Sequence, residues 1–119
     1  MGNIDNKYQC LDKYRRVLCV CTAGLLRSPT MAIVLSQAPY NYNTRAVGID
    51  GEFALIHIDD VLVQWADEIV CAGYNQFIYV TEKWPDKTTI NLNIPDSYDY
   101  RDNELMEMIK RKYDDAVSL

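Results

Sequence analysis

Short strand-like runs alternate with segments of helical character along most of the chain, and this alternation limits the fold more than any other feature. The strand-like runs cover residues 17–20, 43–47, 68–73 and 88–93. Apolar spacing and a first-turn proline predict helices over 28–37, 53–65 and 74–82, and a last helix whose face carries Leu105, Ile109 and Tyr113. Strands that alternate with helices favour a parallel sheet, because a parallel connection needs a crossover. We therefore predict an α/β fold, a small doubly wound sheet of four parallel strands with helices on both faces.

Length and charge place the chain among ordinary globular proteins. Its 119 residues, 49% of them hydrophobic, predict one domain over residues 1–119. No apolar stretch approaches the roughly 18 residues of a membrane span, and the first residues lack the apolar core of a signal peptide. A net charge of −5 without a basic stripe argues against binding to a phosphate backbone. We expect a cytoplasmic protein that binds neither membrane nor nucleic acid.

The cysteines do not have the spacing of a metal site. Cys10, Cys19, Cys21 and Cys71, with the one histidine, His57, do not complete a set of four zinc ligands. A reducing compartment keeps thiols free, so we expect no disulfide framework. We expect Cys10, Cys19 and Cys71 to be small core residues, and we expect no metal and no other cofactor.

Cys21 stands apart because it ends the first predicted strand and is followed by a short loop, Arg27 and Ser28-Pro29. The backbone N–H groups of such a loop, with the N-terminus of the next helix, can bind a tetrahedral oxyanion. Arg27 adds a guanidinium fork for two oxygens of the anion. This positive environment should lower the pKa of the Cys21 thiol and make a thiolate that attacks bound phosphate. Ser28 can donate to that thiolate as it leaves. The expected substrate-binding loop residues are Thr22, Ala23, Gly24, Leu25 and Leu26.

A general acid is expected from the stretch "IPDSYDY" after the last predicted strand. Asp96, positioned by Pro95, can protonate the leaving oxygen and then act as a base toward the water that hydrolyses a phosphocysteine. Asp after Pro is also ordinary turn chemistry, and Asp99 is the alternative acid. Tyr98 is expected to form a wall for an aromatic substrate.

The pattern strand-C-x5-R-S-P, with a late Pro-Asp before a final helix, resembles the low-molecular-weight protein tyrosine phosphatase family. "WADEIVCA" and "NIPDSYDYRDNELMEMI" resemble more specifically a short bacterial and phage-borne branch of predicted tyrosine phosphatases. The likeness covers about residues 16–117. It implies that Cys21 is the nucleophile and that Arg27 binds phosphate. It also implies that Ser28 assists the thiolate and that Asp96 is the general acid. The implied activity is metal-independent hydrolysis of a phosphotyrosyl protein or a small aryl phosphate, with phosphate as product.

Three positions depart from that family. Gly24 stands where the family usually has Asn, Leu26 where many members have a second cysteine, and Ser97 where the better-known members have Pro. Glycine adopts a positive φ easily, but it lacks the amide side chain that braces the loop. Without a neighbouring thiol, Cys71 is the candidate partner for an oxidised Cys21, provided that the two side chains point the same way.

Two other functions stay open. Arsenate reductases share this fold and loop but use a relay of further cysteines, for which only Cys71 is available here. A non-catalytic phosphotyrosine-binding adaptor would keep the loop without turnover, and the missing brace at Gly24 is compatible with that. Cys21, Arg27 and Ser28 together favour the hydrolase. The sequence does not choose among phosphotyrosine, phosphoarginine and a small phosphate ester as the substrate.

Overall fold

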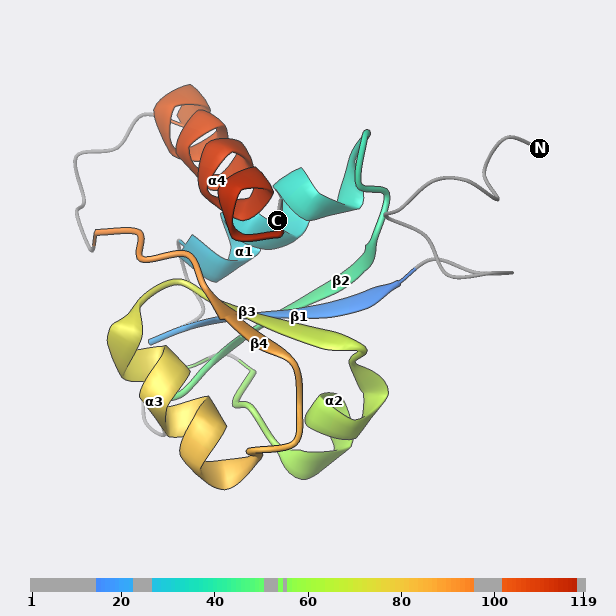
Figure 1. The fold of residues 1–119 in the computed structure, drawn as a ribbon, viewed down its shortest axis with the longest axis vertical. Helices are drawn as coiled ribbons and strands as arrows, with labels where there is room; N and C mark the ends of the chain where they lie inside the picture. Colours follow the sequence, from blue (N-terminus) through green and yellow to red (C-terminus); the bar gives the residue numbers. More distant parts are fainter. Residues whose placement is uncertain (1–14, 23–26, 51–53, 55, 96–101, 118–119) are drawn as a thin grey trace.

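The computed structural model describes residues 15–22, 27–50, 54, 56–95 and 102–117, and in this part of the chain strands and helices alternate (Figure 1). The elements in order are β1 (Arg16–Cys21), α1 (Arg27–Ser36), β2 (Asn43–Gly48), α2 (Asp60–Trp65), β3 (Glu68–Cys71), α3 (Tyr74–Lys83), β4 (Thr89–Asn91) and α4 (Asp102–Val117). The strands form one parallel sheet in the order β2-β1-β3-β4. Figure 1 shows α1 and α4 on one face of this sheet and α2 and α3 on the other. The predicted α/β class and four-stranded parallel sheet are confirmed.

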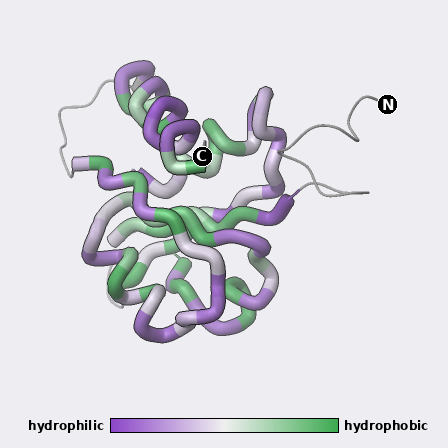
Figure 2. The backbone as a smooth tube through the Cα atoms, viewed as in Figure 1, coloured by the Kyte–Doolittle hydropathy of each residue, from purple (hydrophilic) through white to green (hydrophobic). Residues whose placement is uncertain are grey.

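The sheet has a separate apolar core on each face. β1 is buried from Val17 to Cys21, and its side chains alternate between the two cores, which explains its continuous apolar run. Figure 2 shows hydrophobic residues along the central strands and a largely hydrophilic α4. The core under α1 and α4 includes Val17, Cys19, Cys21, Met31, Val34, Leu35, Leu105, Ile109 and Tyr113. The core under α2 and α3 includes Leu18, Val20, Val47, Ile58, Val63, Ile69, Cys71 and Val80.

The strand order reverses beside β1. The chain passes from β1 to β2 on one side, and it later places β3 and β4 on the other. The carboxyl ends of β1 and β3 therefore lie next to each other at a switch point, which is where open α/β sheets bind their ligands. Cys21 ends β1 at this edge, as the sequence predicted for the start of the phosphate loop.

The predicted helix over residues 53–65 is wrong in its first half, as far as the structure describes it. α2 begins at Asp60, and Asp59 caps it by accepting a hydrogen bond from a backbone N–H three residues later. Ile58 is buried, but it reaches the core from a non-helical segment, so its apolar spacing did not indicate a helix. His57, inside the predicted helix, lies before α2 and is exposed. None of the described helices has the length and apolar character to span a bilayer.

Candidate active site

Cys21 lies at the carboxyl edge of the sheet against the start of α1. Its thiol is only 3% exposed, and it donates a hydrogen bond to Ser28 Oγ at an S···O distance of 3.1 Å. Ser28 is the second residue of α1, and its hydroxyl donates in turn to the carbonyl oxygen of Val47 at 3.2 Å. The structure therefore brings together the thiol and the hydroxyl that the sequence paired.

Arg27 joins two segments that are distant in the sequence. It is the first residue of α1 and is 7% exposed, and its Nη1 donates to the carbonyl oxygen of Ile94 at 3.0 Å. Ile94 follows β4 and precedes Pro95, so this bond attaches the start of α1 to the segment that leads to the predicted acid. A buried guanidinium at this edge favours an anion.

Several predicted site residues lie outside the described part of the chain. These are the loop residues Ala23, Gly24, Leu25 and Leu26, and the residues after Pro95, namely Asp96, Ser97, Tyr98 and Asp99. Of the predicted substrate-binding loop, Thr22 is described, and it is exposed next to Cys21.

Gln76 is a site residue that the sequence did not single out. It lies in the first turn of α3, is 3% exposed, and donates from Nε2 to Thr22 Oγ1 at 2.7 Å. Its Oε1 is buried and has no hydrogen-bond partner among the described residues. The sequence could have indicated Gln76, because it is a polar residue in the first turn of a helix that follows a strand at the ligand-binding edge of the sheet. Gln76 therefore positions the residue that directly follows Cys21.

Gly73 allows the start of α3 to come this close. A Cβ atom on Gly73 would stand 3.1 Å from Gln76 Oε1 and 3.7 Å from Arg27 Nη1. Gly73 is also the N-cap of α3, and it has no side chain with which to cap that helix end. A cavity of about 210 Å³ opens here, lined by Thr22, Arg27, Gly73, Tyr74, Asn75, Gln76, Asn93 and Ile94. Its described lining is largely polar, with Arg27 as its charged member.

The expected contact between Cys71 and Cys21 is contradicted. Cys71 pairs with Val20 in the parallel register, so its side chain enters the core under α2 and α3, whereas Cys21 enters the core under α1 and α4. Burial raises the pKa of the Cys71 thiol to about 12 and also raises that of Cys19. Cys19 and Cys71 are buried, as predicted for small core residues, and Cys10 lies outside the described residues.

Within the described ranges, no group of three or more His, Cys, Asp and Glu side chains has an arrangement that could hold a metal ion.

Comparison with solved structures places this architecture in a known class. The sequence matches no protein-family model and no curated protein. The structure is similar to the YwlE arginine phosphatase from Geobacillus stearothermophilus, with 17% identity, a TM-score of 0.63, and coverage of 82% of this chain and 85% of that one. It is similar to Wzb of Vibrio vulnificus, solved with benzylphosphonate, with 18% identity, a TM-score of 0.67, and coverage of 82% and 93%. It is also similar to the tyrosine phosphatase AmsI of Erwinia amylovora, with 15% identity, a TM-score of 0.67, and coverage of 88% and 94%.

These neighbours define the fold. The chain has the fold of the low-molecular-weight tyrosine phosphatases. Because the identities are below a fifth, the likeness concerns the architecture, and the activity rests on the chain's own residues.

Proposed function

We propose that the protein is a metal-independent phosphomonoester hydrolase of the protein tyrosine phosphatase type that uses a Cys21 phosphocysteine intermediate. The observation that carries this proposal is the contact between Cys21 Sγ and Ser28 Oγ, at the binding edge of a phosphatase fold and next to buried Arg27. Ser28, the hydrogen-bond partner of the thiol, directly follows Arg27 in α1. A thiol in this arrangement fits nucleophilic attack on a bound phosphoryl group.

The reaction proceeds in two displacements at phosphorus. The Cys21 sulfur attacks phosphorus in line with the ester bond, and Asp96 gives a proton to the departing oxygen. Water then attacks the phosphocysteine while Asp96 takes its proton, so that phosphate forms and Cys21 leaves as thiolate. Ser28 donates a hydrogen bond to that thiolate and makes it a better leaving group.

Charge in the transition state is stabilised by Arg27 and by the N–H groups of the loop from Thr22 to Leu26. The bond from Arg27 Nη1 to the Ile94 carbonyl fixes the guanidinium relative to the segment that carries the acid. A fixed guanidinium does not have to reorganise when charge develops, which is the source of its catalytic effect.

The proposed substrate is an aryl phosphate or another small phosphate ester. An N-phosphorylated guanidine is the alternative, and in that case the bond broken is P–N and Asp96 protonates the departing nitrogen. Tyr98 as an aromatic wall favours phosphotyrosine. Gln76 lines the same cavity as Arg27, and its buried Oε1 has no hydrogen-bond partner among the described residues. This acceptor favours instead a leaving group with N–H donors, as in phosphoarginine, and one structural neighbour is an arginine phosphatase.

The test is hydrolysis of para-nitrophenyl phosphate in the presence of EDTA by the wild type and by Cys21→Ser. We expect activity in the wild type and none in Cys21→Ser. Cys71→Ser is the matched control, because it removes a buried thiol on the other face of the sheet, and it should keep the activity. Activity that disappears with EDTA and returns with a divalent ion would contradict the proposal.

The two other functions give different results. An adaptor would bind phosphate or vanadate without turnover. An arsenate reductase would consume thiols with arsenate, but the position of Cys71 away from Cys21 argues against the necessary relay. Parallel assays with a phosphotyrosyl and a phosphoarginyl peptide decide between the two substrate classes.

A further inference from the structure

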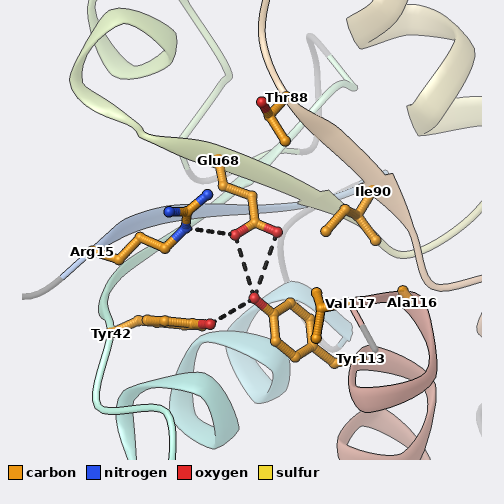
Figure 3. Close-up of a pocket in the computed structure, with 8 residues that line it drawn as sticks. All are labelled: Arg15, Tyr42, Glu68, Thr88, Ile90, Tyr113, Ala116 and Val117. Atoms are coloured by element: carbon orange, nitrogen blue, oxygen red, sulfur yellow. Dashed lines mark hydrogen bonds and ion pairs between the residues drawn. The ribbon is translucent and has the colours of Figure 1, made fainter. Parts of the chain in front are cut away.

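A second cavity lies at the opposite edge of the sheet from Cys21, where the strands begin (Figure 3). Its volume is about 360 Å³, which is within the range of roughly 300–1,000 Å³ typical of small-molecule pockets. It lies between the last turns of α4 and the first residues of β3 and β4. Its lining residues are Arg15, Tyr42, Glu68, Thr88, Ile90, Tyr113, Ala116 and Val117.

Glu68 is the buried charge in this cavity. The residue is 2% exposed, and its Oε1 accepts a hydrogen bond from Arg15 Nε at 2.9 Å. The hydroxyl of Tyr113 lies 3.3 Å from Oε1 and 3.5 Å from Oε2. The Tyr42 hydroxyl lies 2.8 Å from that of Tyr113 and donates to it, because Tyr113 uses its one proton toward Glu68.

The second carboxylate oxygen of Glu68 is underused. Among the described residues, its one hydrogen bond is the 3.5 Å contact with the Tyr113 hydroxyl, which lies slightly closer to Oε1. Figure 3 shows Oε2 on the side of Glu68 that faces Ile90 and Val117, away from Arg15. A buried carboxylate oxygen without a full hydrogen bond is unfavourable, so this end of the cavity calls for a donor.

The surroundings favour a cation. α4 has 16 residues, and its C-terminal end, which carries the negative end of the helix dipole, borders the cavity through Ala116 and Val117. The last turn of α4 has no basic residue, and it carries Asp114 and Asp115. Among the described lining residues, Arg15 alone is cationic.

The two carboxylate oxygens of Glu68 are not equally available, and this distinguishes among the cations that could bind. A hard metal ion needs several oxygen ligands, preferably charged ones, and the described lining offers one carboxylate, Glu68, with otherwise neutral side-chain hydroxyls. A guanidinium binds a carboxylate best through both oxygens, but Oε1 is already bonded to Arg15. An ammonium can bind through Oε2 alone, and the ring of Tyr113 provides a further favourable surface.

We propose that this cavity binds a small primary alkylammonium ion, whose ammonium group donates to Glu68 Oε2 and whose aliphatic chain packs against Ile90 and Val117. The site is separate from the phosphate site and does not depend on catalysis.

The test is an NMR titration of the full chain with n-butylammonium, followed at the backbone amides of Ile90, Tyr113 and Val117. n-Butanol is the neutral probe of matched size. We expect saturable shifts with n-butylammonium and much weaker ones with n-butanol. Cys21→Ser with saturating phosphate should give the same affinity for n-butylammonium. Absent saturation, equal response to both probes, or competition by phosphate would overturn the proposal.

Variants locate the contact. Glu68→Gln keeps the shape and removes the charge, and it should weaken binding about tenfold or more, because a charge-assisted bond is lost. This change also removes the ion pair with Arg15, so a second variant is needed. Val117→Phe fills the cavity and keeps the contacts of Glu68. It should weaken binding as strongly as Glu68→Gln does. Asp115→Asn removes an exposed charge from the same helix end and should change the affinity by less than about twofold. The proposed site would be refuted if Asp115→Asn lowered the affinity for n-butylammonium as much as Glu68→Gln does. It would also be refuted if neither Glu68→Gln nor Val117→Phe changed that affinity.

Discussion

Cys21 and Ser28 form a hydrogen bond of 3.1 Å in which the thiol donates to the hydroxyl oxygen. Ser28 uses its own proton on the Val47 carbonyl, at 3.2 Å. When Cys21 is a thiolate the direction must reverse, because a thiolate can only accept. In the proposed reaction the hydroxyl therefore turns from Val47 to Cys21.

We expect Ser28→Ala to slow the breakdown of the phosphocysteine more than its formation. A hydrogen bond to a charged group contributes about 1.5–3 kcal/mol, so kcat should fall about 10- to 100-fold. Rapid-mixing kinetics with para-nitrophenyl phosphate should then show a burst of nitrophenol. Ser36→Ala, which removes an exposed hydroxyl at the end of the same helix, is the control and should behave as the wild type. Turnover unchanged in Ser28→Ala would limit this residue to a structural role.

We expect Asp96→Asn to lower turnover about 10²- to 10³-fold for substrates with poor leaving groups and much less for good ones. A general acid matters most when the leaving oxygen needs its proton. A series of aryl phosphates with different leaving-group pKa values measures this dependence. If Asp99→Asn shows the pattern instead, Asp99 is the acid, and equal losses across the series would argue against both.

We expect Gln76→Met to raise the inhibition constant of inorganic phosphate, since Thr22 loses the 2.7 Å bond that positions it. A neutral hydrogen bond is worth about 1 kcal/mol, so the inhibition constant should rise about fivefold. Glu82→Gln changes an exposed residue of the same helix and serves as control. An unchanged inhibition constant would show that Gln76 does not position the loop.

We expect peroxide to abolish the proposed phosphatase activity without forming a disulfide between Cys21 and Cys71. The two thiols lie on opposite faces of the sheet, and the raised pKa of Cys71, about 12, keeps it protonated at neutral pH. Mass spectrometry should find sulfinic acid at Cys21 with Cys71 unmodified. Bound phosphate should protect Cys21 from this oxidation. Recovery of activity with thiols, together with a peptide that links the two cysteines, would contradict this.

We expect the ion pair between Arg16 and Asp67 to contribute stability that acid removes. Burial disfavours the charged Asp67, but hydrogen bonds from the Arg16 side chain and backbone N–H outweigh it and hold the pKa below its usual value. The contribution is therefore complete above the unfolded pKa of about 3.9 and is lost as pH falls through the lower folded value. Asp67→Asn should reduce the free energy of unfolding at pH 7 by about 0.5–1 kcal/mol.

Denaturant unfolding at pH 7 and at lower pH measures this difference, which should shrink toward acid. Asp86→Asn, at an exposed position between α3 and β4, is the control. A difference that stays constant down to about pH 2, well below the unfolded pKa, would exclude the ion pair as its cause.

The sequence predicted the helices and strands whose local residue pattern matches the environment that they have in the fold. A continuous apolar run is what a strand with both faces covered requires, so β1 was recognisable. Pro29 in a first turn indicated α1 in the same way. In residues 53–65 the apolar spacing was ambiguous, because Ile58 reaches the core from a non-helical segment and Asp59 caps a helix that begins only at Asp60.

The rest depends on contacts between distant residues. Which face Cys71 occupies follows from its pairing with Val20, and register cannot be read from one strand alone. Glu68 is the first residue of β3, where a charged side chain would ordinarily be exposed, but Arg15 and Tyr113, from distant parts of the sequence, make its burial tolerable. Gln76 is recognised as a site residue only from its contact with Thr22, which depends on how α3 packs.

The bond from Arg27 to the Ile94 carbonyl has an evolutionary consequence. Beside the anion binding that we propose for it, this arginine has a structural role, since it ties the start of α1 to the segment after β4. A descendant that gave up catalysis would be released from selection on Cys21 but would still need a buried cation at position 27. Among homologues, substitution at Cys21 should therefore be the earlier mark of lost activity, and a retained arginine would be no proof of an enzyme.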